Sequence, residues 1–210
     1  MSESSTANAR RAQIIKAARE LYGEKGIERT SVKDITERAG ITRSLFYHYF
    51  SCKEDVTDAL LDYYVEGFAS DLEELTAQLD PKDTRGSIYV IARLLRYEIY
   101  DNDAFRTDLL KPENAYIYQQ FMQRTAEMLS HRLVLIAQNG GVLDTTKIRH
   151  PYETYYIAIV GLVGYMRQHP GVSDDLIAEI LADLVHADIG AASSEAGEAS
   201  DSVKPADPAV

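Results

Sequence analysis

Apolar residues recur along this chain with the spacing of an α-helix. Near the N-terminus they fall at i, i+1, i+4, i+7 and i+8 and form one stripe, made of Ile14, Ile15, Ala18, Leu21 and Tyr22. Gly26 follows at the position of a helix C-cap. Similar stripes recur almost to the C-terminus, without a β-hairpin signal or an internal repeat. The pattern predicts an all-α fold with about nine helices.

Two short helices separated by a tight turn are predicted after the first one. Thr30 and Ser31 offer an N-cap for a helix of about two turns that ends at Gly40. Thr42 can cap a third helix, whose apolar residues share one face: Leu45, Phe46, Tyr49 and Phe50. Three helices with a tight turn between the second and third are the plan of a helix-turn-helix, whose third helix enters the DNA major groove.

The rest of the chain predicts a larger helical domain. A long helix begins at Lys53 and is stopped by Asp80-Pro81. Further helices are expected over residues 88–99, 103–110, 114–139, 151–169 and 174–185. The predicted organisation is a flexible N-terminus at 1–8, a DNA-binding head at 9–53, a helical domain at 54–189 and a disordered tail at 190–210, where apolar periodicity is lacking.

Charge is distributed unevenly between the two ends of the chain. The formal net charge is −11, which alone would argue against binding to a polyanion. Residues 1–55 hold ten Lys and Arg against eight Asp and Glu, so the acidic excess lies in the remainder. This asymmetry fits a protein whose N-terminal head can approach phosphate while the rest of the chain is acidic. Charge also varies in this way along chains that bind no nucleic acid.

Composition and apolar runs indicate an ordinary soluble protein. Hydrophobic residues make up 45% of the chain, and Cys52 is the one cysteine, so no intrachain disulfide can form. The first nine residues contain no apolar stretch typical of a secretion signal. The most apolar run, Tyr155 to Met166, is shorter than the roughly 20 residues that cross a bilayer. We expect a cytoplasmic location and no membrane association.

The third predicted helix carries the candidate DNA-reading face. If its apolar residues point inward, the outward residues all donate hydrogen bonds: Thr42, Arg43, Ser44, Tyr47 and His48. An arginine can address guanine O6 and N7 with two bonds, and the others can bind base edges or phosphates. Lys53, at the start of the next helix, is a candidate phosphate contact. The alternative is a merely solvated polar face, which many short helices have.

The segment from Thr30 to Glu54 resembles the DNA-binding head of the TetR/AcrR family of bacterial transcription regulators. Its turn Ala39-Gly40, the residues Tyr47 and Phe50, and the pair Lys53-Glu54 are in register with the family pattern, and the resemblance extends over residues 9–56. Three residues depart from the family's common choices: Thr36, Ser44 and Cys52. Ser44 adds a side chain at the DNA-facing surface, so no known operator sequence transfers to this chain.

The resemblance implies further features of site and assembly. It adds Thr30 and Ser31, at the start of the second helix, to the candidate DNA-binding residues. It also implies that residues 54–189 form a ligand-binding and dimerisation domain. Candidate ligand contacts are polar and aromatic residues on two body helices: Tyr89, Arg96, Tyr100, Tyr118, Phe121, Thr125 and Arg132. The arginines could meet an anionic effector or internal carboxylates. Candidate dimer contacts lie on the last two helices: Tyr155, Ile159, Val163, Ile177, Ile180 and Leu184.

These features predict a sequence-specific transcription regulator. We expect a repressor that binds a near-palindromic duplex operator as a homodimer and is released by a small molecule. One rival keeps the DNA-binding head without a small-molecule ligand and acts constitutively or with a protein partner. Another rival is a helical-bundle enzyme, but the chain shows no HExxH sequence, paired Cys/His spacing or serine elbow. No catalytic residue, metal or cofactor is therefore expected.

Overall fold

The computed structural model describes residues 3–80, 82–100, 103–138 and 148–189, and their regular structure is entirely helical. The elements are α1 (Glu3–Lys25), α2 (Val32–Ala39), α3 (Arg43–Tyr49), α4 (Lys53–Ala77), α5 (Thr84–Tyr100), α6 (Ala104–Leu109), the 3-10 helix η1 (Pro112–Asn114), α7 (Ala115–Gln138), α8 (Pro151–Gln168) and α9 (Asp174–Leu184). None of these described helices is long and apolar enough to cross a membrane. The all-α expectation is confirmed.

Two boundaries differ from the sequence-based expectation. Helix α1 begins at Glu3, so residues 3–8, expected to be a flexible N-terminus, are helical. The described residues also divide into two compact units, of which the first holds 3–66 and 103–121 and the second holds 67–100 and 122–189. The first unit thus contains α6 in addition to the predicted head. The expected tail at 190–210 lies outside the described residues.

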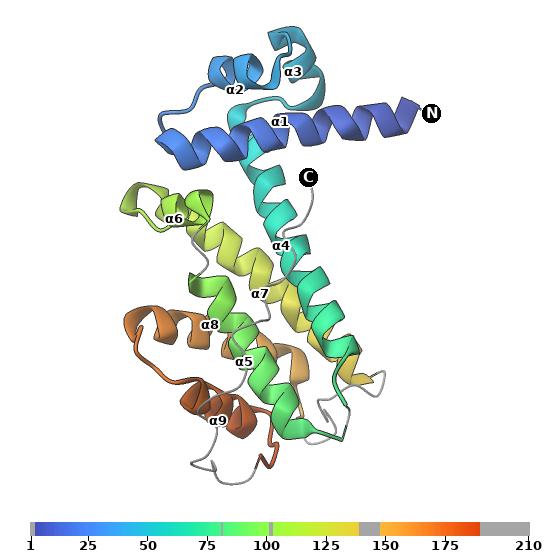
Figure 1. Ribbon diagram of the computed structural model, residues 1–210, viewed down its shortest axis with the longest axis vertical. Coiled ribbons are helices and arrows are strands. Elements are labelled where there is room, and N and C mark those ends of the chain that lie inside the picture. The colour runs from blue at the N-terminus through green and yellow to red at the C-terminus, as the bar shows by residue number, and fades with distance from the viewer. Residues whose placement is uncertain (1–2, 81, 101–102, 139–147, 190–210) are drawn as a thin grey trace. The chain divides into compact units, whose positions relative to one another are not determined.

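The first unit is built around the apolar face of α1. Helix α2 packs on one side of α1, and α6 also packs against α1, as the ribbon shows (Figure 1). The interior consists of fully or nearly fully buried side chains from four helices: Ile14, Ala18 and Tyr22 of α1, Ile35 of α2, Phe46 of α3, and Val56 and Leu60 of α4. The stripe read from the sequence of α1 is therefore the face that forms this core.

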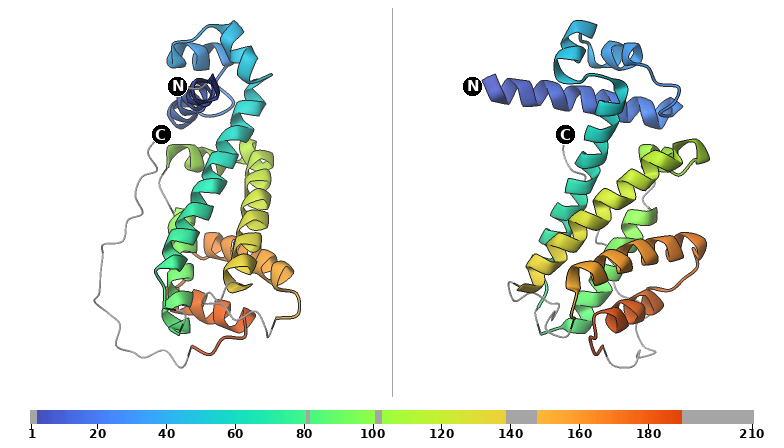
Figure 2. Two further views of the ribbon diagram at one scale, coloured as in Figure 1. Left: turned by 90° about the vertical axis from the view of Figure 1, so that its right-hand side faces the viewer. Right: turned by 180° about the vertical axis from the view of Figure 1, so that it is seen from behind.

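The second unit gathers the C-terminal helices around α5. Helix α9 packs along α5, and α8 contacts both of them (Figure 2). Its buried residues include Ile88 and Ala92 of α5, Met166 of α8, and Ile177 and Ala178 of α9. Ser173 caps α9 by accepting a hydrogen bond from the Leu176 amide at 3.2 Å.

Candidate nucleic-acid interface

A side-chain cap at the start of α2 and a glycine cap at its end set up the turn before α3. The hydroxyl of Ser31 accepts from the Asp34 amide, while the Asp34 carboxylate accepts from the Ser31 amide at 2.8 Å, which forms a capping box. Hydrogen bonds from Ser31, joined by Lys25, lower the pKa of Asp34. Gly40 ends the helix with φ 63°, a left-handed conformation that glycine adopts without strain. The chain then turns tightly into α3.

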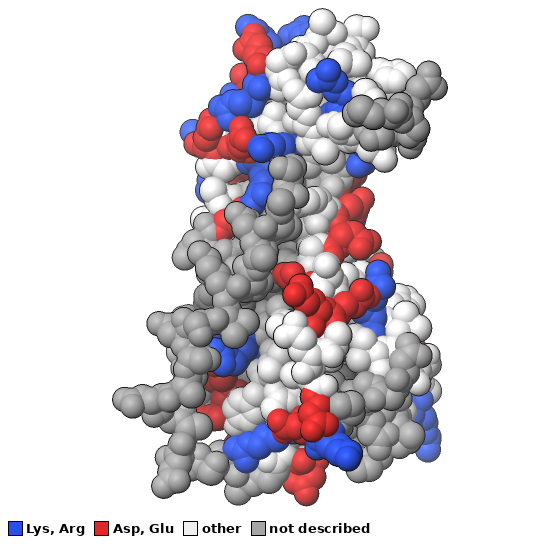
Figure 3. Space-filling view, turned by 45° about the vertical axis from the view of Figure 1, so that its right-hand side comes forward, with Lys and Arg blue, Asp and Glu red and all other residues white. Residues whose placement is uncertain are grey.

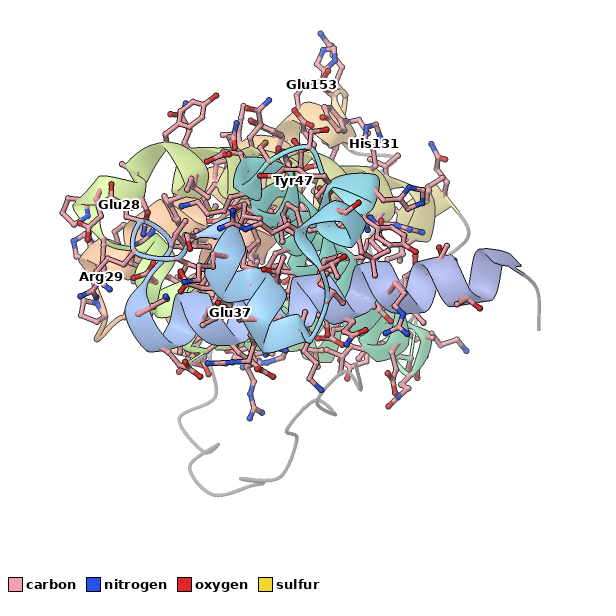
Figure 4. The ribbon with its side chains drawn as sticks, turned by 90° about the horizontal axis from the view of Figure 1, so that it is seen from above. Glu28, Arg29, Glu37, Tyr47, His131 and Glu153 are labelled. Atoms are coloured by element: carbon pink, nitrogen blue, oxygen red, sulfur yellow. The ribbon has the colours of Figure 1, made fainter. Side chains whose placement is uncertain are left out.

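Helix α3 presents the polar face that the sequence predicted. Phe46 and Phe50 are buried beneath the helix, while Thr42, Arg43, Ser44, Tyr47 and His48 are all exposed. Tyr47 is 57% exposed. The view from above the first unit labels Tyr47 on this surface and Glu37 on α2 (Figure 4). Five donors therefore occupy one solvent-facing surface at the N-terminal unit.

The side chains of three other predicted DNA contacts form hydrogen bonds within the unit. Thr30 is 2% exposed and its hydroxyl donates to the Gly26 carbonyl at 2.8 Å, so its side chain does not belong to the exposed surface. This placement corrects the expectation for Thr30, whose hydroxyl bonds the loop that joins α1 to α2. Ser31 is exposed, but its hydroxyl serves the capping box. The Lys53 ammonium donates to the Ile27 carbonyl at 2.9 Å.

Asp103 ties α6 to two other helices, a role that the sequence did not reveal. Its carboxylate accepts from the α6 amides of Phe105 and Arg106, from Arg19 of α1 at 2.8 Å and from the Tyr64 hydroxyl of α4 at 2.7 Å. Burial opposes ionisation of this group, but the bonds from Arg19 and Tyr64 outweigh it, so the pKa of Asp103 is lowered. The feature of the sequence that could have indicated this role is an aspartate at the N-cap position of a short helix.

Aromatic stacking adds to this connection. The ring of Phe105 stacks on Tyr22 with centroids 5.8 Å apart and on Tyr64 with centroids 5.3 Å apart. Tyr22 in turn bonds the Thr57 hydroxyl at 2.9 Å in the interior, and burial raises the pKa of Tyr22 to about 12. Phe105 thus joins α1 and α4 through a three-ring stack.

A second aspartate of α6, Asp108, holds the loop between α1 and α2. Its side chain is only 5% exposed and accepts from the Ile27 amide at 2.9 Å and from the Asn114 side chain at 3.1 Å. Lys111 forms an ion pair with it. A Cβ added to Gly26, which has φ 87°, would lie 3.1 Å from this carboxylate. The loop before α2 is therefore anchored by a residue about 80 positions away, which no local pattern indicates.

The candidate ligand residues do not converge as predicted. Arg96 pairs with Asp174 and donates to the Val172 carbonyl, Arg132 pairs with Glu73, and the Tyr89 hydroxyl donates to Asp175 at 2.7 Å. These three groups serve helix-to-helix contacts within the second unit, which corrects the expectation of an arginine-lined anion site. The side chain of Tyr100 lies outside the described residues. Tyr118 and Phe121 belong to the first unit.

Thr125 is a candidate ligand residue whose buried hydroxyl has no partner in the described part of the chain to explain its burial. It is 7% exposed, and its hydroxyl has no hydrogen-bond partner among the described residues. A buried hydroxyl without a partner is costly, because it has lost its bonds to water.

Most of the predicted dimer residues lie on the buried side of their helices. Tyr155, Ile159 and Val163 of α8, together with Ile177 of α9, are buried within the chain itself, whereas Ile180 and Leu184 are partly exposed. The apolar residues of α8 that face solvent are instead Ile157, Val160 and Tyr165, joined by Leu176 of α9. Because apolar residues surround much of α8, periodicity alone did not distinguish the inner from the outer face.

Comparison with known proteins supports both the head and the fold. Residues 14–60 match the model of the bacterial regulatory proteins of the tetR family. The transcriptional repressor KstR2 of Mycobacterium tuberculosis H37Rv is 36% identical over 59 residues, which cover 28% of this chain and 30% of that protein. The regulator TtgR of Pseudomonas putida is 46% identical over 52 residues, 25% of each protein. The matched segments thus span less than a third of these two relatives.

Solved structures match over most of the chain. RolR in complex with resorcinol has a TM-score of 0.62 and 19% identity, with 89% of this chain and 92% of that chain covered. FadR of Bacillus subtilis in complex with stearoyl-CoA has a TM-score of 0.51 and 20% identity, with 83% and 97% covered. A TetR/AcrR regulator of Thermobifida fusca has a TM-score of 0.51 and 26% identity, with 84% and 96% covered.

Proposed function

We propose that the chain is a sequence-specific DNA-binding repressor of the TetR/AcrR family of bacterial transcription regulators. The observation that carries this proposal is the exposed donor face of α3, held over the buried rings of Phe46 and Phe50. A face of this kind fits the major groove, where base edges present acceptors to side-chain donors. The protein then acts in the cytoplasm, where the DNA is.

The five exposed residues divide by the contacts that their chemistry allows. Arg43 binds a guanine edge with two hydrogen bonds, and no carboxylate among the described residues competes for it. Thr42, Ser44, Tyr47 and His48 bind neighbouring bases or phosphates. Lys53 uses one of its three ammonium donors on Ile27, which leaves two for a phosphate.

We assign DNA binding to a homodimer on a near-palindromic operator. One small head makes few base contacts, and two heads on one face of the duplex double them. The exposed face of α8, with Ile157, Val160, Gly161 and Gly164, offers a surface for an isologous interface. Nothing lies within 4 Å of a Cβ added to either glycine, so a second helix can approach closely there. Leu176, Ile180 and Leu184 extend this surface onto α9.

A small-molecule effector completes the proposal. The similar structures RolR and FadR hold resorcinol and stearoyl-CoA, respectively. In this chain the unpartnered Thr125 hydroxyl offers a hydrogen bond to such a molecule inside the second unit. Binding there shifts the protein towards a state with lower operator affinity and so releases the DNA.

Selection from a random duplex library tests the DNA-binding function. The purified protein should enrich a sequence with two related half-sites about one helical turn apart, or a multiple of that spacing. The Arg43→Ala variant should lose the enriched preference at one base pair of each half-site. If the wild-type protein enriches no duplex, the chain is not a sequence-specific DNA-binding protein.

A further inference from the structure

The ten cations of residues 1–55 fall into groups according to their partners. Four form ion pairs: Arg19 with Asp103, Lys25 with Asp34, Lys33 with Glu37, and Arg38 with Glu20 and Glu24. Arg29 and Lys53 donate to backbone carbonyls. The space-filling view shows basic and acidic groups against one another on the first unit (Figure 3). Among the described residues, Arg10, Arg11, Lys16 and Arg43 have neither kind of partner.

Arg10 and Arg11 continue the packing face of α1 beyond its core. They lie four and three residues before the fully buried Ile14, so they project from the same side of the helix. Both are nevertheless exposed, because this end of α1 extends past the helices on which it packs (Figure 1). This face of α1 is apolar at Ile14 and basic at Arg10 and Arg11, so two positive charges lie at the edge of the DNA-binding head.

Contacts place these two arginines beside the helix-turn-helix. The Arg11 guanidinium lies 5.2 Å from the ring centroid of Phe50, the residue that caps the end of α3. Arg10 donates to the Gln13 side chain at 2.8 Å, and Gln13 donates to the carbonyl of Ala39, the last residue of α2, at 2.7 Å. One arginine thus lies near the end of α3, and the other is linked to the end of α2 just before the turn.

We propose that Arg10 and Arg11 bind backbone phosphates beside the major groove that α3 enters. Guanidinium groups pair with phosphate through parallel hydrogen bonds, and no carboxylate of the described residues competes for these two. Contacts of this type are independent of sequence and position the protein on the duplex. This inference rests on the proposed DNA-binding function and adds two residues to the contacts predicted from the sequence.

Binding at several salt concentrations tests the inference. The Arg10→Gln/Arg11→Gln variant removes both charges, and glutamine has a similar helix propensity. Affinity for the selected site and for random duplex should fall by the same factor, with base preferences unchanged. The slope of log K against log salt should become shallower by about 0.9 for each phosphate that the head no longer binds, hence by about 1.8 per head. Thermal unfolding should change little.

Two further variants separate phosphate binding from other effects. Lys16→Gln is the matched control, because Lys16 is an exposed, unpaired cation on the opposite side of α1 from Ile14. It should leave the salt slope unchanged, whereas Arg10→Lys/Arg11→Lys should keep the wild-type slope. An unchanged slope in the glutamine variant, or an equal change in Lys16→Gln, overturns the inference while the DNA-binding function stands. A wild-type protein that binds no duplex overturns both.

Discussion

Arg43 shows how a single side chain can decide sequence preference. Its replacement by alanine should weaken binding to the preferred site by about 1–3 kcal/mol, because bidentate recognition of guanine is lost. Arg29→Ala is a suitable control, since Arg29 is exposed but donates to the Lys25 carbonyl. Titrations of both variants against the operator and its single-base variants measure the effect. If Arg43→Ala retains every base preference, Arg43 is a phosphate contact and sequence reading belongs to Thr42, Ser44 or Tyr47.

Asp108 should make the stability of the first unit depend on pH. Burial opposes its ionisation, but the ion pair with Lys111 and the bond from the Ile27 amide outweigh that effect, so its folded-state pKa is lowered. In the unfolded chain the pKa of an aspartate is near 3.9, so the lower pKa of folded Asp108 means that its ionised carboxylate stabilises the fold above that pH. This stabilisation is lost as the pH falls from that value towards the folded-state pKa. Asp108→Asn should therefore cost about 1.5–3 kcal/mol at pH 7.

Chemical denaturation of wild type and Asp108→Asn from pH 7 to pH 3 measures this dependence. The difference in unfolding free energy should shrink towards pH 3, because the carboxyl of the unfolded wild-type chain then becomes protonated while Asp108 in the folded protein stays ionised to lower pH. Glu113→Gln is a control, since Glu113 is an exposed carboxylate of the adjacent 3-10 helix. A difference that stays constant over the range would mean that the charge of Asp108 contributes nothing.

At the scale of elements, α6 should stabilise the head through one ring. Phe105 is 1% exposed between Tyr22 and Tyr64, so Phe105→Ala leaves a cavity between α1 and α4 and should cost about 3–5 kcal/mol. Phe105→Leu fills most of that space and should cost less. Urea denaturation of both variants tests this. Equal stability of Phe105→Ala and wild type would show that α6 does not hold the head together.

Sequence patterns predicted the helices and the DNA-facing surface better than the contacts between distant segments. The caps at Ser31 and Thr42 and the inward Phe46 follow from local spacing, and the structure confirms each of them. Periodicity could not reveal that Asp108 binds the Ile27 amide, because such a pair depends on how remote helices meet. The same limitation applies to Arg96 and Arg132, whose carboxylate partners lie on other helices.

At the scale of the whole molecule, the exposed face of α8 predicts the oligomeric state. Ile157 is 67% exposed, and a solvent-facing apolar stripe beside two glycines is typical of a surface that another helix covers. Ile157→Asp should convert the dimer to a monomer, because two carboxylates would face each other across an isologous interface without a partner. Sedimentation velocity at micromolar concentration measures this change.

A matched substitution shows whether the effect belongs to α8. Leu135 of α7 is also an exposed apolar residue, at 51%, so Leu135→Asp introduces the same charge elsewhere in the second unit. It should leave the dimer intact and operator affinity unchanged. Ile157→Asp, in contrast, should weaken operator binding strongly, because a monomer binds only one half-site and lacks the second head's contribution. A monomeric wild-type protein that still binds the palindromic site tightly would contradict this assignment of the interface.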